Sequence, residues 1–142
     1  MNISLSGDVA RAIRDSFARQ GLMTTMDARI DDLHAGRVVL SMPITSVISQ
    51  QHGFAHAGAS FALGDSAAGY AALSMMPPDS EVLTIEMKIN LIAPAAGHRL
   101  IAEGEVIRSG RRLSVVRATV LAEDATGERK ATAILQGTMI PA

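Results

Sequence analysis

One acidic residue, Asp65, lies within a long run of small and apolar residues. Nearly every position from Ala57 to Ser74 is Ala, Gly, Ser, Leu, Phe or Tyr. A helix that is apolar on all sides is expected to be buried. An unpaired carboxylate is unfavourable there, so its presence indicates a chemical role. Since burial raises the pKa of a carboxyl group, the sequence predicts that Asp65 is a catalytic acid or base near a helix start.

A polar loop containing His52 and His56 leads into this helix. The start of a helix offers unpaired N–H groups and partial positive charge, which can stabilise an oxyanion. Gly58 and Asp65 are seven residues apart, so they share a helix face but lie about 10 Å apart along the axis. One protomer does not easily bring both to the same carbonyl carbon, whereas two antiparallel helices in a two-fold dimer can. We therefore expect a composite active site, with two in each dimer.

These residues also have other interpretations. Asp65 could cap a second helix that begins after a break at Gly64. His52 and His56 could bind a metal ion, although no third ligand is near in the sequence. Ser60 could be a nucleophile, but its segment lacks the second glycine of a nucleophile elbow and follows no strand. We expect His56 to fix the loop through hydrogen bonds.

The composition excludes several classes of protein. The 142 residues are expected to form one domain, 1–142, with a net charge of −1 from 13 basic and 14 acidic residues. The chain has four Phe, Tyr and Trp residues in total and no basic run, which argues against nucleic-acid binding. It has no cysteine, so disulfides, thiol catalysis and Cys-ligated zinc are excluded.

The hydropathy pattern predicts neither a transmembrane helix nor a signal peptide. Asp65 interrupts the longest apolar stretch, and Met1–Asp8 lacks a charged region followed by an apolar one. We therefore expect a cytoplasmic protein that does not bind membranes. Its high apolar fraction, 48%, points to further surface buried by self-association.

Periodicity predicts the elements that position these residues. In the first half, Val9, Ile13 and Phe17 recur every four residues, which indicates an amphipathic helix. The expected elements are a helix at Asp8–Gln20, strands near Thr25–Ile30 and Val38–Ile44, a loop at Thr45–Ala55 and the buried helix to about Met76.

The second half alternates apolar and polar residues between tight turns, which is typical of antiparallel strands. The expected strands are Leu83–Leu91, Leu100–Arg108, Leu113–Glu123 and Arg129–Met139. Five or six strands and one buried helix predict an α+β fold in which a sheet wraps around the helix.

This order of elements resembles the hotdog fold, a curled antiparallel sheet around a central helix. From about Gly21 onward the sequence is similar to the acyl-CoA thioesterases of the phenylacetate-degradation (PaaI-like) family. The family motif is His-Gly-Gly followed by an Asp within the helix, and here it reads His56-Ala57-Gly58 and then Asp65. Two further segments agree with the family, Leu83–Pro94 and Val106–Leu113.

The resemblance implies a role for each matching residue. Asp65 would be the general base or nucleophile, and the N–H of Ala57 or Gly58 would polarise the thioester carbonyl. Gln50 takes the place of an orienting Asn of the family, and Thr84 matches a residue that holds the attacking water. No cofactor is implied, because coenzyme A is part of the substrate.

Alternatives remain for how coenzyme A binds, how many copies of the chain assemble and which reaction takes place. The cationic turn residues Arg108, Arg111 and Arg112 could bind the phosphates of coenzyme A or form a solvated turn. The chain could form a homodimer or a homotetramer. A hydratase or dehydratase using His56, or a non-catalytic acyl-CoA-binding module, are the competing functions.

Overall fold

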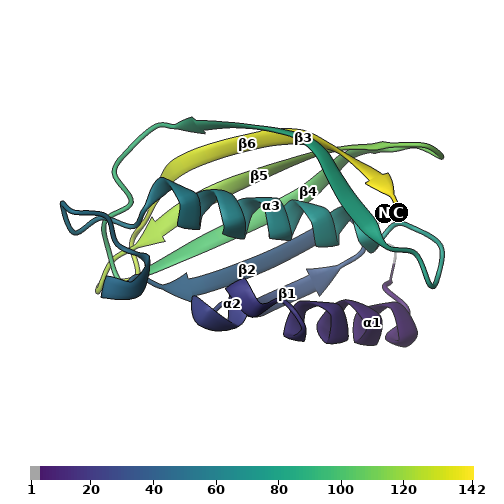
Figure 1. The fold of residues 1–142 in the computed structure, drawn as a ribbon, viewed down its shortest axis with the longest axis horizontal. Helices are drawn as coiled ribbons and strands as arrows, with labels where there is room; N and C mark the ends of the chain where they lie inside the picture. Colours follow the sequence, from purple (N-terminus) through teal and green to yellow (C-terminus); the bar gives the residue numbers. More distant parts are fainter. Residues whose placement is uncertain (1–3) are drawn as a thin grey trace.

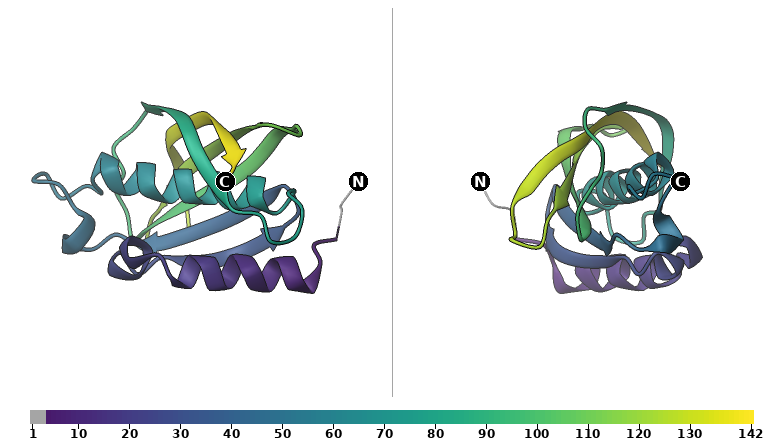
Figure 2. Two further views of the ribbon diagram at one scale, coloured as in Figure 1. Left: turned by 45° about the vertical axis from the view of Figure 1, so that its right-hand side comes forward. Right: turned by 90° about the vertical axis from the view of Figure 1, so that its left-hand side faces the viewer.

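A curled antiparallel sheet wraps around one long helix in the computed structural model, which describes residues 4–142 (Figures 1 and 2). The elements are α1 (Gly7–Ala18), α2 (Gly21–Thr25), β1 (Arg29–His34), β2 (Arg37–Pro43), the 3-10 helix η1 (Ser46–Ile48), α3 (Ala57–Leu73), β3 (Val82–Leu91), β4 (Arg99–Ser109), β5 (Ser114–Glu123) and β6 (Arg129–Pro141).

Strand β3 lies at one edge of the sheet, whose order is β1-β2-β4-β5-β6-β3. It pairs antiparallel with β6, the last strand of the chain, with Leu91 opposite Ala133 and Thr84 opposite Met139. The strand that follows α3 in the sequence is therefore separated from β4, the next strand along the chain, by β5 and β6. This placement leaves one side of β3 without a partner strand.

Helix α3 is buried because its side chains are small. Ala67, Ala68, Ala71 and Ala72 are completely inaccessible to solvent and contribute to the core with the inward residues of the sheet. The concave face of the sheet closes over the helix, as the end-on view shows (Figure 2). The small residues let the two layers approach closely, as predicted.

At Gly104 of β4 the sheet approaches α3 too closely to leave room for a Cβ atom. A Cβ atom added there would lie 2.3 Å from the carbonyl carbon of Ala67. Gly104→Ala must therefore push the sheet away from α3, and we expect it to lower the free energy of unfolding by about 1–3 kcal/mol. Gly7→Ala, which meets nothing within 4 Å, is the control and should change stability by less than about 0.5 kcal/mol. Equal denaturant midpoints for the two variants would contradict this account.

Helix α1 packs on the C-terminal half of α3. Its Ile13 is completely buried, and Phe17 contacts Tyr70 of α3 edge-on, with ring centroids 6.1 Å apart. Ser6 caps the helix by accepting a hydrogen bond from the Val9 N–H. The amphipathic pattern thus predicted this helix correctly, although it ends at Ala18 and a separate short helix, α2, follows.

The predicted strand at Thr25–Ile30 is wrong. Residues 21–25 form α2, and β1 begins only at Arg29. Met23 and Met26 are both buried and three residues apart, which is helical spacing, and Asp27 has a positive φ of 54° that turns the chain into β1. The other strands begin and end within two residues of their predicted bounds.

The buried helix also ends earlier than predicted, at Leu73 rather than Met76. The Ser74 hydroxyl donates to the Ala71 carbonyl at 2.6 Å and accepts from the Gly36 N–H at 2.8 Å. These bonds satisfy the end of the helix before Pro77 is reached.

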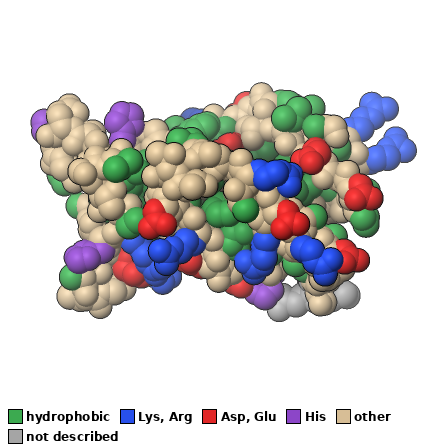
Figure 3. Space-filling view, turned by 60° about the horizontal axis from the view of Figure 1, so that its bottom comes forward, with side chains coloured by type: hydrophobic (Ala, Val, Ile, Leu, Met, Phe, Trp, Pro, Cys, Tyr) green, Lys and Arg blue, Asp and Glu red, His purple; other side chains and the backbone are tan. Residues whose placement is uncertain are grey.

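The described surface contains charges of both signs. On the face in Figure 3, Lys and Arg side chains alternate with Asp and Glu side chains rather than forming a single basic patch. No helix within residues 4–142 is long and apolar enough to cross a membrane.

Candidate active site

The N-terminus of α3 holds one unpaired backbone donor. His56 is the N-cap residue, and its Nδ1 accepts a hydrogen bond from the Gly58 N–H at 2.8 Å. The N–H groups of Ala59 and Ser60 donate to the His56 carbonyl. Within residues 4–142 nothing accepts from the N–H of Ala57. Of the two predicted oxyanion donors, Gly58 is therefore already engaged and Ala57 is available.

The loop before α3 holds this cap in place. The Ala55 N–H donates to the Ala95 carbonyl at 2.9 Å, and the His56 N–H donates to the Ile48 carbonyl at 2.7 Å. The Gln50 Oε1 accepts from the His52 N–H, which fixes the Gln50 amide. His56 thus fixes the junction between the loop and α3 through hydrogen bonds of its backbone N–H and its ring, as predicted.

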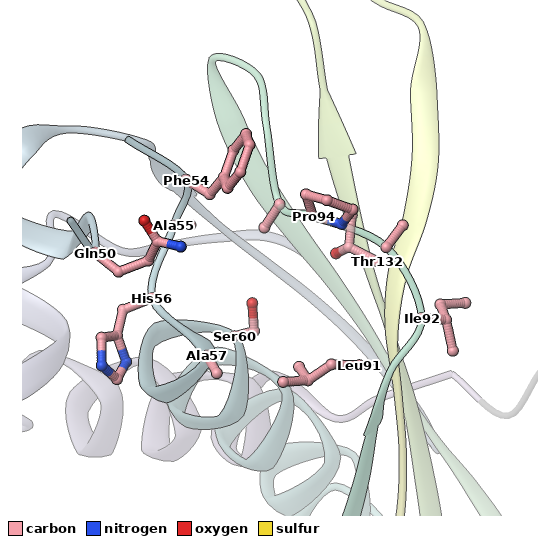
Figure 4. Close-up of a pocket in the computed structure, with 12 residues that line it drawn as sticks. Gln50, Phe54, Ala55, His56, Ala57, Ser60, Leu91, Ile92, Pro94 and Thr132 are labelled. Atoms are coloured by element: carbon pink, nitrogen blue, oxygen red, sulfur yellow. The ribbon is translucent and has the colours of Figure 1, made fainter. Parts of the chain in front are cut away.

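Gln50 and Ala57 border the same cavity, of about 540 Å³, at this end of the molecule. Figure 4 shows the Gln50 amide nitrogen and the Ser60 hydroxyl on the cavity side, whereas the His56 ring points away from it. The remaining walls are mostly apolar. They are Phe54, Ala55, Leu91, Ile92, Ala93, Pro94 and Ala95, with His56 and Thr132.

Asp65 lies in the middle of α3, facing strand β3. Its Oδ1 accepts a hydrogen bond from the Thr84 hydroxyl at 2.8 Å. Burial raises the pKa of the Asp65 carboxyl above its ordinary value, and the hydrogen bond from Thr84 opposes this with a smaller effect. A carboxylate with a raised pKa and a bond that orients it suits proton abstraction.

Helix α3 is continuous from Ala57 to Leu73, so Asp65 does not cap a second helix. Thr84 lies beside this acid only because β3 runs along α3. Strand pairing therefore brings together two residues predicted separately from the sequence.

The unpaired N–H and the acid are not brought together within one protomer. Asp65 and Thr84 line a second cavity, of about 320 Å³, which shares no lining residue with the cavity at Ala57. Asp65 follows Ala57 by eight residues, which corresponds to about 12 Å along the helix axis. This is too far for both to contact one carbonyl group.

The three predicted cationic residues lie at the turn between β4 and β5. Arg108, Arg111 and Arg112 are exposed, and none forms an ion pair with another described residue. Ser109 pairs with Ser114, which pairs with Met139 opposite Thr84. The turn is therefore at the same end of the sheet as the acid.

Ser60 was considered from the sequence only as a possible nucleophile, and the polar residues around Asp65 other than Thr84 were not predicted. Ser60 is three residues after Ala57, so helical spacing would place it on the same face, and its hydroxyl faces the first cavity. The cavity beside Asp65 is lined by Ser16 of α1, by Gln20 at the start of α2 and by Tyr70 of α3. No local pattern identifies these, because α1 and α3 are far apart in the sequence.

Comparison with known proteins places these residues in a family context. The family model described as Thioesterase superfamily matches residues 52–128, more than half of the chain. The solved structure of a thioesterase family protein from Silicibacter pomeroyi is 47% identical, with a TM-score of 0.91, covering 94% of this chain and 97% of that one.

Two further proteins are similar over most of the chain. A 1,4-dihydroxy-2-naphthoyl-CoA hydrolase of Listeria monocytogenes is 28% identical over 67% of this chain and 77% of its own length. The PaaI protein of the E. coli phenylacetic acid degradation operon shares the fold, with a TM-score of 0.84 at 21% identity, covering 98% of this chain and 96% of that one. The predicted hotdog fold is confirmed.

Proposed function

The chain belongs to the thioesterase superfamily, and from this premise we propose that it hydrolyses acyl-CoA thioesters in the cytoplasm, without a bound cofactor. The proposal is supported chiefly by Asp65, a partly buried acid with a raised pKa that Thr84 holds on a helix whose start has an unpaired N–H. A similar protein is described as a hydrolase of an acyl-CoA, which supports this class of substrate.

Asp65 and the Ala57 N–H have distinct roles in the proposed hydrolysis of the thioester. Asp65, as general base, takes a proton from water while the water oxygen bonds to the thioester carbonyl carbon. The carbonyl π electrons move to oxygen, and the Ala57 N–H and the helix dipole stabilise that charge. Collapse of the intermediate breaks the C–S bond, and the departing coenzyme A thiolate takes up the proton held by Asp65, which restores the base. Direct attack by Asp65 on the carbonyl carbon is the other route, in which the thiolate leaves and a mixed anhydride forms. Water that opens this anhydride at the Asp65 carbonyl would place ¹⁸O from labelled water in Asp65 in a single turnover.

We propose that two protomers share each site. The free edge strand β3 exposes Leu83, Ile85 and Leu91, each more than half accessible to solvent. Antiparallel pairing of β3 with its copy would bury them and bring Thr84 of one protomer near Leu91 of the other. Thr84 borders the cavity of the acid and Leu91 borders that of Ala57, so this pairing joins the two half-sites.

The remaining predicted residues take supporting roles in this proposal. Gln50 would orient the thioester through its amide nitrogen, and Arg108, Arg111 and Arg112 would bind phosphates of coenzyme A. The hydratase alternative is disfavoured, because the His56 ring caps α3 and points away from the cavity.

Measuring coenzyme A release with a panel of aromatic and aliphatic acyl-CoA esters tests this function. Hydrolysis predicts free coenzyme A and free acid in equal amounts. A hydrated acyl-CoA product would establish a hydratase instead. Binding of acyl-CoA without any turnover would leave a binding module.

Thr84→Val is expected to move the acid limb of the pH–rate profile to higher pH. The Thr84 hydroxyl stabilises the Asp65 carboxylate, so its removal raises the pKa of Asp65 further and leaves less ionised base at low pH. On that limb kcat should fall about two- to tenfold, the range for one hydrogen bond, while the high-pH plateau is kept. Thr84→Ser, which retains the hydroxyl, should keep the wild-type limb. Identical limbs in both variants would refute this role.

A further inference from the structure

The cavity beside Asp65 has a polar wall to which Ser16 of α1 and Gln20, the N-cap residue of α2, contribute. Both residues lie outside residues 52–128, which the family model matches. The other lining residues are Asp65, Ser66, Gly69, Tyr70 and Leu73 of α3 and residues 81–84. The catalytic step proposed above uses only Asp65 and Thr84 among them. The rest of the cavity is available to the acyl group.

A chain of hydrogen bonds holds this wall together. The Gln20 Nε2 donates to the Tyr70 hydroxyl oxygen at 2.8 Å, and that oxygen lies 3.1 Å from the Ser16 hydroxyl. Tyr70 is only 5% exposed, and its ring is fixed edge-on against Phe17. The wall is therefore held in place by contacts within the chain.

These bonds leave one donor and one acceptor unused. The Tyr70 and Ser16 hydroxyls share one hydrogen bond in which either can be the donor, so one of their two protons has no acceptor among residues 4–142. The Gln20 Oε1 also has no partner in the described part of the chain. A ligand hydroxyl, which both donates and accepts, is complementary to this pair.

The charges that line the cavity and the spacing of Asp65 and Tyr70 along α3 restrict the class of ligand further. The described lining of the cavity includes two acids, Asp65 and Glu81, and no Lys or Arg, so an anionic end group is disfavoured. Tyr70 follows Asp65 by five residues, or about 7.5 Å along the helix axis. That is about the reach of an extended six-carbon acyl chain from its carbonyl group.

We propose that Ser16, Gln20 and Tyr70 form the far wall of the acyl site and select neutral acyl groups that end in a hydroxyl. The inference rests on the proposed thioesterase function, since Asp65 marks where the thioester carbonyl lies. The acyl chain would pack against the apolar side chains of Leu73, Val82 and Leu83, and the polar wall would bind its terminal hydroxyl.

Three esters of equal length test this selection: hexanoyl-, 6-hydroxyhexanoyl- and adipoyl-CoA. For the wild type, kcat/KM should be about tenfold higher for the hydroxyl ester than for hexanoyl-CoA, and lowest for the carboxylate. In Gln20→Leu and Tyr70→Phe the ratio of kcat/KM between the hydroxyl ester and hexanoyl-CoA should fall to about one. Arg14→Leu, at an exposed position of α1, should keep the wild-type preference.

Non-hydrolysable thioethers separate this inference from the proposed function. Calorimetry should give tighter binding of 6-hydroxyhexyl-CoA than of hexyl-CoA, and Gln20→Leu should abolish the difference. Hydrolysis of all three esters with a ratio unchanged in Gln20→Leu would overturn the wall while leaving the thioesterase. A Gln20-dependent binding preference without any hydrolysis would support the wall and overturn the activity.

Discussion

Asp65→Asn is expected to lower kcat for coenzyme A release by about 10²–10⁴-fold, the range for loss of a general base. The amide has nearly the shape of the carboxylate and can still accept the Thr84 hydrogen bond, but it cannot take a proton from water. The affinity for a non-hydrolysable thioether should change little, so the substitution should lower kcat without a comparable change in KM. The measurement is steady-state coenzyme A release with the best ester of the panel.

Stability provides the control for this substitution. Burial raises the pKa of Asp65 in the folded protein, so its favourable contribution to folding is present below the unfolded pKa and lost as pH rises through the folded pKa. At neutral pH an uncharged asparagine should therefore leave Tm unchanged or raise it. The exposed Glu128→Gln removes a charge elsewhere and should alter neither kcat nor Tm. Wild-type kcat in Asp65→Asn would exclude this acid as the base.

Ala57→Pro is expected to lower kcat by about 10²–10³-fold, the range for one oxyanion donor. Proline removes the N–H of the first residue of α3 but is favoured there, because its fixed φ suits a helix start. His56 already has the extended conformation, with φ −63° and ψ 142°, that a residue before proline requires. Ala57→Gly keeps the N–H and is the matched control. Equal kcat for the two variants would show that another group polarises the carbonyl.

The two defective variants together test the shared site. In a mixed dimer of Asp65→Asn and Ala57→Pro, one site carries both defects and the other carries neither. Random mixing makes half of the dimers mixed, so about a quarter of wild-type activity should return. Differently tagged protomers confirm that mixed dimers form. Mixed dimers without recovered activity would show that each protomer holds a complete site.

Local sequence patterns were sufficient to predict most of the helices and strands. The alternation in the second half predicted β3 to β6 within two residues, because the two faces of each strand meet core and solvent in turn. The small residues of α3 predicted its burial, which Gly104 and Ala67 confirm. The strand predicted at Thr25–Ile30 failed because period-2 and helical spacings overlap over so short a segment.

The sequence by itself determined that an acid lies in a buried small-residue helix, eight residues after the first residue of that helix. Only the tertiary structure decided which residues surround it. Pairing of β3 with β6 placed Thr84 beside Asp65, and packing of the N-terminal helices near α3 added Ser16 and Gln20 to the same cavity. The cap at His56 left Ala57 as the free donor. Periodicity records which face of an element is buried, whereas contacts between distant segments depend on how those faces pack together.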